Sequence, residues 1–328
     1  MRVVGLAVVG AVLVLVVIAS LAIGTKSIPF STVVRALIDF DGSTEHLVVR
    51  ELRLPRTIVG LLVGSALGVA GALMQAITRN PLADPGLLGV SAGASFAVVV
   101  AIFVLGIGSL TAYVWFALFG AAVTSVAVFA LGSLGRGGAN PVRLALAGAA
   151  LSALLGSLIS SVVLVDRQTL DQYRFWVVGS LAGRDMTILG QVTPFLLVGL
   201  LLAFGLSRSL NALALGEDAA RALGTRVGVT RLMTVFAVTM LAGGATAACG
   251  PIAFIGLTVP HLARIVCGPD QRWLLPFSAV LGPVVLLSSD IVGRIIARPA
   301  EVQVGIMTAA LGGPIFVLLV RRVRMASL

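Results

Sequence analysis

Long apolar runs, separated by short polar segments, occur along the whole of this sequence. A helix that crosses a membrane needs about 20 mostly apolar residues. Ten segments come close to that requirement: 3–23, 57–77, 86–106, 112–134, 144–165, 188–206, 232–248, 252–267, 274–293 and 304–320. The pattern predicts an all-α integral membrane protein with about ten transmembrane helices in a single domain, 1–328.

Two of these spans need comment. The segment 232–267 is too long for one crossing, because a helix rises about 1.5 Å per residue, and it is interrupted at Gly250-Pro251, where a helix should break. We therefore expect two shortened helices that meet at a break. The first span also fits a signal peptide, with Arg2, an apolar run and small residues near Ala22. Its length and the many later spans favour an uncleaved helix.

Composition supports the membrane prediction and excludes other classes. The 328 residues are 59% hydrophobic and 11% charged, whereas soluble domains have roughly 45–50% apolar and about 25% charged residues. The formal charge of +10 comes from basic residues dispersed between apolar runs. This distribution is typical of residues that flank membrane spans, so we predict contact with membrane lipid and no binding of nucleic acid. Cys249, Cys267, His46 and His261 lie too far apart to suggest a metal site.

The distribution of charge predicts an orientation. Ten spans place both termini on one side of the membrane, and with that side cytoplasmic thirteen Lys and Arg residues lie inside and ten outside. This modest excess agrees with the positive-inside rule. We expect a multi-pass protein of the cell (inner) membrane with both termini cytoplasmic.

No charged residue lies near the centre of a predicted span. Ion-coupled carriers usually hold an ionisable residue there, so either another energy source drives this chain or it is a passive channel. The one lysine, Lys26 in Gly24-Thr25-Lys26-Ser27, lacks the glycine pattern of a phosphate-binding loop. We expect no cofactor on this chain, and any ATP and Mg to bind a partner ATPase.

Glycines recur on successive turns of the second span, at Gly60, Gly64, Gly68 and Gly71. Small residues at this spacing let helices approach closely in lipid. We interpret them as packing residues, with a smooth pore wall as the alternative.

The loop of about 207–226 is where an ATPase would bind. It holds two helix-forming pieces, with acids at the start of the second piece, where they suit a helix N-terminus, and Gly224 where a helix would stop. The block Asp218-Ala219-Ala220-x-x-x-Gly224 matches the Glu-Ala-Ala-x-x-x-Gly loop of ABC importer permeases, with Asp in place of Glu. The predicted coupling residues are Leu213, Gly216, Glu217, Asp218, Ala219, Ala220, Arg221, Leu223 and Gly224. An ordinary interfacial helix is the alternative.

Further blocks extend this match. They are Arg53-Leu54-Pro55-Arg56, the run from Asn80-Pro81 to Ser91, Trp176-x-x-Gly179-Ser180-Leu181, the run from Gly250-Pro251 to Val259-Pro260-His261-x-x-Arg264, Asp290-x-x-x-Arg294 and Gly312-x-Pro314-x-Phe316. Together they closely resemble FecCD-type permeases, which import iron–siderophore complexes, haem and vitamin B12 through ABC transporters. The resemblance runs from about residue 50 to the C-terminus.

The resemblance implies an ABC type II importer permease fold and several partners. These are ABC ATPase subunits, an extracytoplasmic substrate-binding protein, and a second permease copy or paralogue. It also implies that acids of the binding protein meet Arg53, Arg56 and Arg294, for which snorkelling at the membrane edge is the alternative. The inner gate of the family corresponds to about Asn140, Pro141 and Val142, where Pro and Val depart from the small hydroxyl residues of some relatives.

We therefore predict the translocation subunit of an ATP-driven ABC importer, which moves an iron–siderophore-type complex into the cytoplasm by alternating access. Haem or vitamin B12 is the alternative cargo, and a passive channel or ion-coupled carrier is the more remote alternative. His261 belongs to the general Val-Pro-His block of the family, and we interpret it as structural rather than as a haem ligand.

Overall fold

The structure, a computed structural model, describes residues 2–134 and 141–326. Within these ranges the elements are all helical. They are α1 (Arg2–Ala22), α2 (Phe30–Ile38), α3 (Thr44–Leu47), η1 (Val48–Arg53), α4 (Leu54–Thr78), η2 (Pro85–Leu88), α5 (Val90–Leu105), α6 (Leu110–Ser133), α7 (Pro141–Val165), α8 (Arg167–Val177), α9 (Met186–Ala214), α10 (Glu217–Ala222), α11 (Val227–Cys249), α12 (Ile255–Cys267), α13 (Gln271–Ile296) and α14 (Val304–Ala326).

Ten of these helices coincide with the ten predicted spans. Seven are long and apolar enough to cross a membrane: α1, α4, α6, α7, α9, α11 and α13. α4 is part of one continuous helix, Thr44–Thr78. The other three, α5, α12 and the apolar part of α14, are shorter. The all-α membrane fold predicted from the hydrophobic pattern is therefore confirmed.

The predicted break after α11 is present, but only one of the two helices is short. α12 has 13 residues, which is about 20 Å of helix, whereas α11 has 23 residues. α11 begins at Val227 rather than at 232, because the helix continues beyond the apolar run through the polar residues Thr230 and Arg231. The break itself contains Gly250 and Phe254, both with positive φ.

Some helices were not predicted, because their sequences do not form long apolar runs. α8 is the clearest case, an amphipathic helix between two predicted spans. The carboxylate of Asp166 caps it by accepting a hydrogen bond of 2.7 Å from the backbone N–H of Thr169. Side-chain capping of this kind stabilises the first turn of a helix.

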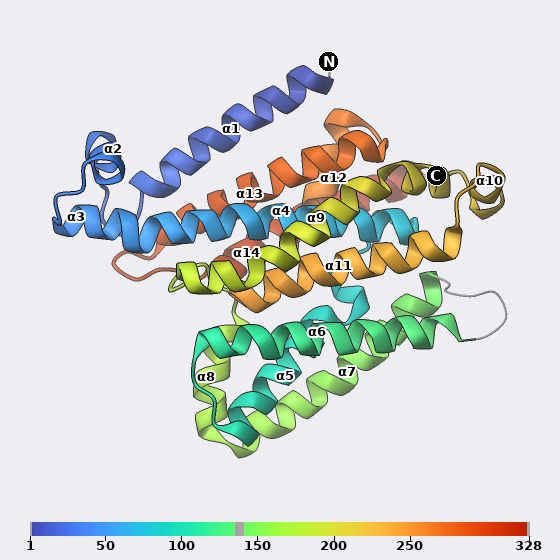
Figure 1. The fold of residues 1–328 in the computed structure, drawn as a ribbon, viewed down its shortest axis with the longest axis horizontal. Helices are drawn as coiled ribbons and strands as arrows, with labels where there is room; N and C mark the ends of the chain where they lie inside the picture. The colour runs from blue at the N-terminus through green and yellow to red at the C-terminus, as the bar shows by residue number, and fades with distance from the viewer. Residues whose placement is uncertain (1, 135–140, 327–328) are drawn as a thin grey trace.

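The bundle has two distinct ends. Figure 1 shows α10 and the end of α14 at one end, with α2 and α3 at the other. α1 begins on the α10 side, because Arg2 lies 3.8 Å from Asp270, whose carboxylate also binds Asn211 near the end of α9. We name the α10 end the inner end and the α2–α3 end the outer end, after the predicted orientation.

α4 is the centre of the packing, and its glycines allow it. A Cβ placed at Gly71 would lie 1.8 Å from the carbonyl oxygen of Gly256 in α12. A Cβ at Gly64 would lie 2.5 Å from the backbone of Pro283 in α13. Such backbone contact is what closely spaced small residues permit in membrane helices. The packing interpretation of these glycines is confirmed.

We predict that Gly71→Ala destabilises the fold by about 1–3 kcal/mol, because overpacking at a backbone contact forces two helices apart. The matched control is Gly205→Ala on α9, where an added Cβ meets nothing within 4 Å. Thermal unfolding of the purified chain in detergent is the measurement. Equal melting temperatures for the two variants would contradict the assignment of Gly71 to a backbone contact.

Candidate functional site

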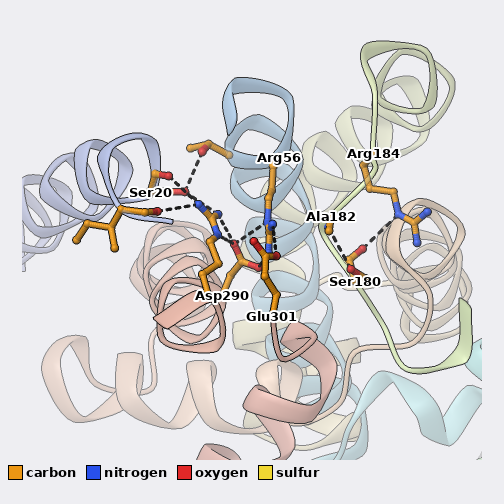
Figure 2. A network of polar contacts seen from close by, with 10 residues as sticks. Ser20, Arg56, Ser180, Ala182, Arg184, Asp290 and Glu301 are labelled. Atoms are coloured by element: carbon orange, nitrogen blue, oxygen red, sulfur yellow. Dashed lines mark hydrogen bonds and ion pairs between the residues drawn. The ribbon is translucent and has the colours of Figure 1, made fainter. Parts of the chain in front are cut away.

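A buried carboxylate organises the outer end. Asp290 of α13 is fully buried and accepts hydrogen bonds from Arg56 at 2.7 and 3.1 Å and from Arg294 Nε at 2.9 Å. A second nitrogen of Arg294 also pairs with Asp290. The third guanidinium nitrogen of Arg56, Nη1, lies 2.7 Å from the Glu301 carboxylate. Figure 2 shows these side chains converging from three segments of the chain.

Two arginines of this region also hold the end of α1. Arg294 Nη1 donates to the carbonyl of Ser20 at 2.8 Å. Arg53 Nη1 donates to the carbonyls of Leu21 and Ala22, both at 2.7 Å. The last carbonyls of a helix have no partner within the helix, and cations near them are stabilising. The two guanidinium groups therefore cap α1.

The structure brings the three predicted docking arginines together but places them inside the protein. Arg53 is 6% exposed and Arg294 is 1% exposed. The Arg56 side chain is 11% exposed and is paired with two acids. Their predicted contact with acids of a binding protein stays a prediction, and it would require these internal bonds to change. The Asp290-x-x-x-Arg294 spacing was a sequence signal for an internal pair, because residues four apart face each other on a helix.

At the inner end, the predicted coupling loop divides into a buried and an exposed side. Its second helical piece is α10, which starts after Gly216 and is followed by Gly224, both with positive φ. Leu213 and Ala220 are buried against the bundle. The exposed residues include Leu215, Leu223, Asp218, Ala219 and Arg221. The segment therefore presents apolar and charged side chains together at the surface.

Glu217 ties α10 to the rest of the bundle. Its carboxylate pairs with Arg221 at 2.9 Å and with Arg231 of α11. The hydrogen bond from Arg231 holds the pKa of Glu217 below its usual value of 4.5. Because the pKa is lower in the folded state, ionised Glu217 stabilises the fold above pH 4.5. This contribution is lost as the pH falls from 4.5 through the folded-state pKa. Sequence analysis did not single out Arg231.

The turn between α4 and α5 supports the start of α7. The Asp84 carboxylate accepts a hydrogen bond of 2.8 Å from the backbone N–H of Gly86 and so shapes the turn that contains η2. A Cβ at Gly148 of α7 would lie 1.8 Å from the carbonyl oxygen of Leu87, so the two backbones touch. This rigid inner turn agrees with the two prolines of the segment.

The predicted inner gate lies at the start of α7. Asn140 lies outside the described residues, and Pro141 is the first residue of α7. The side chain of Val142 is 65% exposed. The gating role of the three residues stays a prediction.

Comparison with known proteins decides the family. The sequence model of the FecCD transport family matches residues 12–322 of this chain. The chain belongs to the FecCD transport family. The resemblance predicted from the Arg-Leu-Pro-Arg, Asn-Pro-Leu-Ala-Asp-Pro and Gly-Pro-Ile blocks is therefore confirmed.

Individual relatives agree with the family. The chain is 45% identical to the "Probable siderophore transport system permease protein YfiZ" of Bacillus subtilis, over 95% of this chain and 93% of the relative. It is 49% identical to the ferric enterobactin permease FepD of Escherichia coli, over 92% and 90%. A solved metal-chelate-type ABC transporter in an inward-facing conformation superposes with a TM-score of 0.85 at 30% identity, covering 97% of this chain and 98% of the other. This FecCD chain therefore has the fold of an ABC importer permease.

We predict that Asp290→Asn destabilises the FecCD chain by about 3–5 kcal/mol, because the buried Arg294 loses its counter-charge and Arg56 keeps only Glu301. The control is Asp171→Asn on α8, which breaks an exposed pair with Arg174 at 3.1 Å and should change stability little. Thermal unfolding in detergent compares the two. A melting temperature for Asp290→Asn as high as that of the control would show that the outer network does not depend on this carboxylate.

Proposed function

We propose that this chain is the translocation subunit of an ATP-driven importer that moves an iron–siderophore-type complex into the cytoplasm. The observation that carries the proposal is its high identity, over nearly the full length, with permeases named for siderophore and ferric enterobactin transport. Haem is the second candidate cargo, because a hemin permease of Yersinia pestis is 40% identical over 83% of this chain.

In this proposal the inner end faces the cytoplasm and the protein lies in the cell (inner) membrane. The excess of Lys and Arg at predicted cytoplasmic positions supports this orientation. The start of α1, the end of α14 and α10 then lie on the side where ATP is available. ABC ATPase subunits bind ATP and Mg there, and the exposed residues Leu215 and Leu223 of the coupling segment offer them an apolar contact.

Two further partners complete the assembly. A substrate-binding protein delivers the complex to the outer end, and a second permease copy or paralogue completes the pathway. α7 supports this pairing, because its apolar residues Leu146, Leu154 and Leu158 are exposed in the single chain. The start of α7, at Asn140 to Val142, is the proposed inner gate.

The link between ATP and the pathway runs along α11. At its inner end Arg231 pairs with Glu217 of α10. At its outer end the carbonyl of Cys249 accepts a hydrogen bond of 2.8 Å from the backbone N–H of Ser180 in the loop 178–185. A displacement of α10 by the ATPase is thereby passed along a single helix to the outer surface, as alternating access requires.

Uptake by the reconstituted assembly tests the proposed function. Proteoliposomes that contain the chain, its ATPase and its binding protein are supplied with radiolabelled iron as a ferric siderophore, or with hemin. We expect ATP-dependent uptake of the ferric siderophore and little uptake of hemin. Uptake of hemin alone would move the assignment to the haem class, and solute flow without ATP would replace the importer by a channel.

We predict that Glu217→Arg or Arg231→Glu alone reduces ATP-driven uptake about tenfold or more, because each places like charges in the α10–α11 contact. The double variant restores the opposite charges and should recover much of the uptake, as expected for interacting residues. The readout is iron taken up per ATP hydrolysed in the same proteoliposomes. If the double variant takes up as little iron as the single variants, the pair of Glu217 and Arg231 does not link α10 to α11.

A further inference from the structure

Arg184 differs from the other buried arginines of the outer end. It lies in the loop 178–185 between α8 and α9, is 6% exposed, and its Nε donates to the carbonyl of Ser180 at 3.2 Å. In the described part of the chain no carboxylate lies within 4.0 Å of its guanidinium nitrogens. Figure 2 shows its guanidinium turned away from the Asp290 cluster. Its charge is therefore not balanced by an internal ion pair.

The backbone around Arg184 is held in place. The N–H of Ser180 binds the carbonyl of Cys249, and the N–H of Gly305 binds the carbonyl of Gly179 at 3.0 Å. Leu181 in the same loop is fully buried. The loop is thereby fixed to the ends of α11 and α14, so Arg184 is presented from a rigid support, which is what a binding residue needs.

Arg184 lines an open pocket of about 390 Å³ at the outer end. The other residues of its wall are Glu51, Leu52, Arg56, Ala182, Gly183, Asp185 and Glu301. Three acids share this wall with the two arginines. Glu301 is already paired with Arg56, and the Asp185 carboxylate accepts a hydrogen bond from the backbone N–H of Ile188 at the start of α9. Glu51 is exposed, so water and salt screen its charge. No atom lies within 4 Å of a Cβ placed at Gly183, so space is left beside Arg184.

This arrangement calls for an external anion. The contacts of Arg184 with the Ser180 carbonyl and the Cys249 side chain supply no opposite charge. A buried charge without a counter-charge costs several kcal/mol, and the forked donors of a guanidinium match a pair of anionic oxygens. A pocket of this size lies within the range of small-molecule sites, about 300–1,000 Å³. Because Arg184 is 6% exposed and lines this pocket, a small group that enters the pocket suits it better than the broad face of a protein.

We propose that this outer pocket binds an anionic oxygen group of the transported chelate, of the carboxylate or catecholate class, and that Arg184 is the residue that binds it. The proposal rests on the proposed function, because it takes a metal chelate as the cargo. It makes Arg184 a contact for cargo entering the permease, separate from the capping arginines Arg53 and Arg294.

The test uses the complete assembly in proteoliposomes, with a ferric tricatecholate as the anionic cargo. We expect Arg184→Gln to raise the cargo concentration for half-maximal uptake about tenfold, the effect of losing one charged hydrogen bond. Arg184→Lys should retain part of the affinity, and Arg174→Gln on the exposed face of α8 should behave as wild type. Affinity for the binding protein without cargo is measured in parallel and should not change.

A second variant keeps the test decisive if Arg184→Gln does not assemble. Ala182→Trp fills the pocket from its exposed edge without altering the buried arginine, and it should raise the half-maximal concentration as well. Unchanged uptake in both variants would overturn the proposal. An equal loss of affinity for the empty binding protein would also overturn it, because Arg184 would then belong to the docking surface. Wild type that takes up no ferric chelate would instead refute the proposed function.

Discussion

The outer end of this protein depends on the pairing of one buried carboxylate with two arginines. Asp290 pairs with both Arg56 and Arg294, and Glu301 gives Arg56 a second negative charge. Arg294 in turn caps the end of α1, a helix that is otherwise almost unburied in the chain. Breaking a buried pair is far more costly than breaking an exposed one. The position of α1 therefore depends on Asp290 of α13, through Arg294.

The glycine face of α4 sets a second constraint. Backbone atoms of α4, α12 and α13 are in direct contact at Gly71 and Gly64. Backbones in direct contact cannot move closer together, so these contacts fix how near α12 and α13 lie to α4. The three helices are therefore tightly packed against one another between the two ends.

The sequence predicted the helices well and the partners of the arginines poorly. A membrane span is a property of consecutive residues, so apolar runs in the sequence predicted where the spans lie. Gly250-Pro251 predicted the break after α11 for the same reason. Arg56 and Asp290 are 234 residues apart, so no local pattern could pair them, and the family resemblance suggested an external role instead. The helix α8 was not predicted, because it is polar and the prediction relied on long apolar runs. Helical spacing alone could have indicated the pair of Asp290 and Arg294, four residues apart, as it could the pair of Glu217 and Arg221.

The two ends of α11 differ in a way that assigns their roles. At the inner end, the pair of Glu217 and Arg231 is partly open to water, with the Glu217 side chain 35% exposed. The Arg231 side chain is only 9% exposed, so the pair holds α10 to α11 more firmly than an ion pair between two exposed side chains would. At the outer end, Cys249 and the loop 178–185 meet through buried backbone bonds next to Arg184. A contact of that kind holds its geometry, so in the proposed function α11 and the loop 178–185 move together.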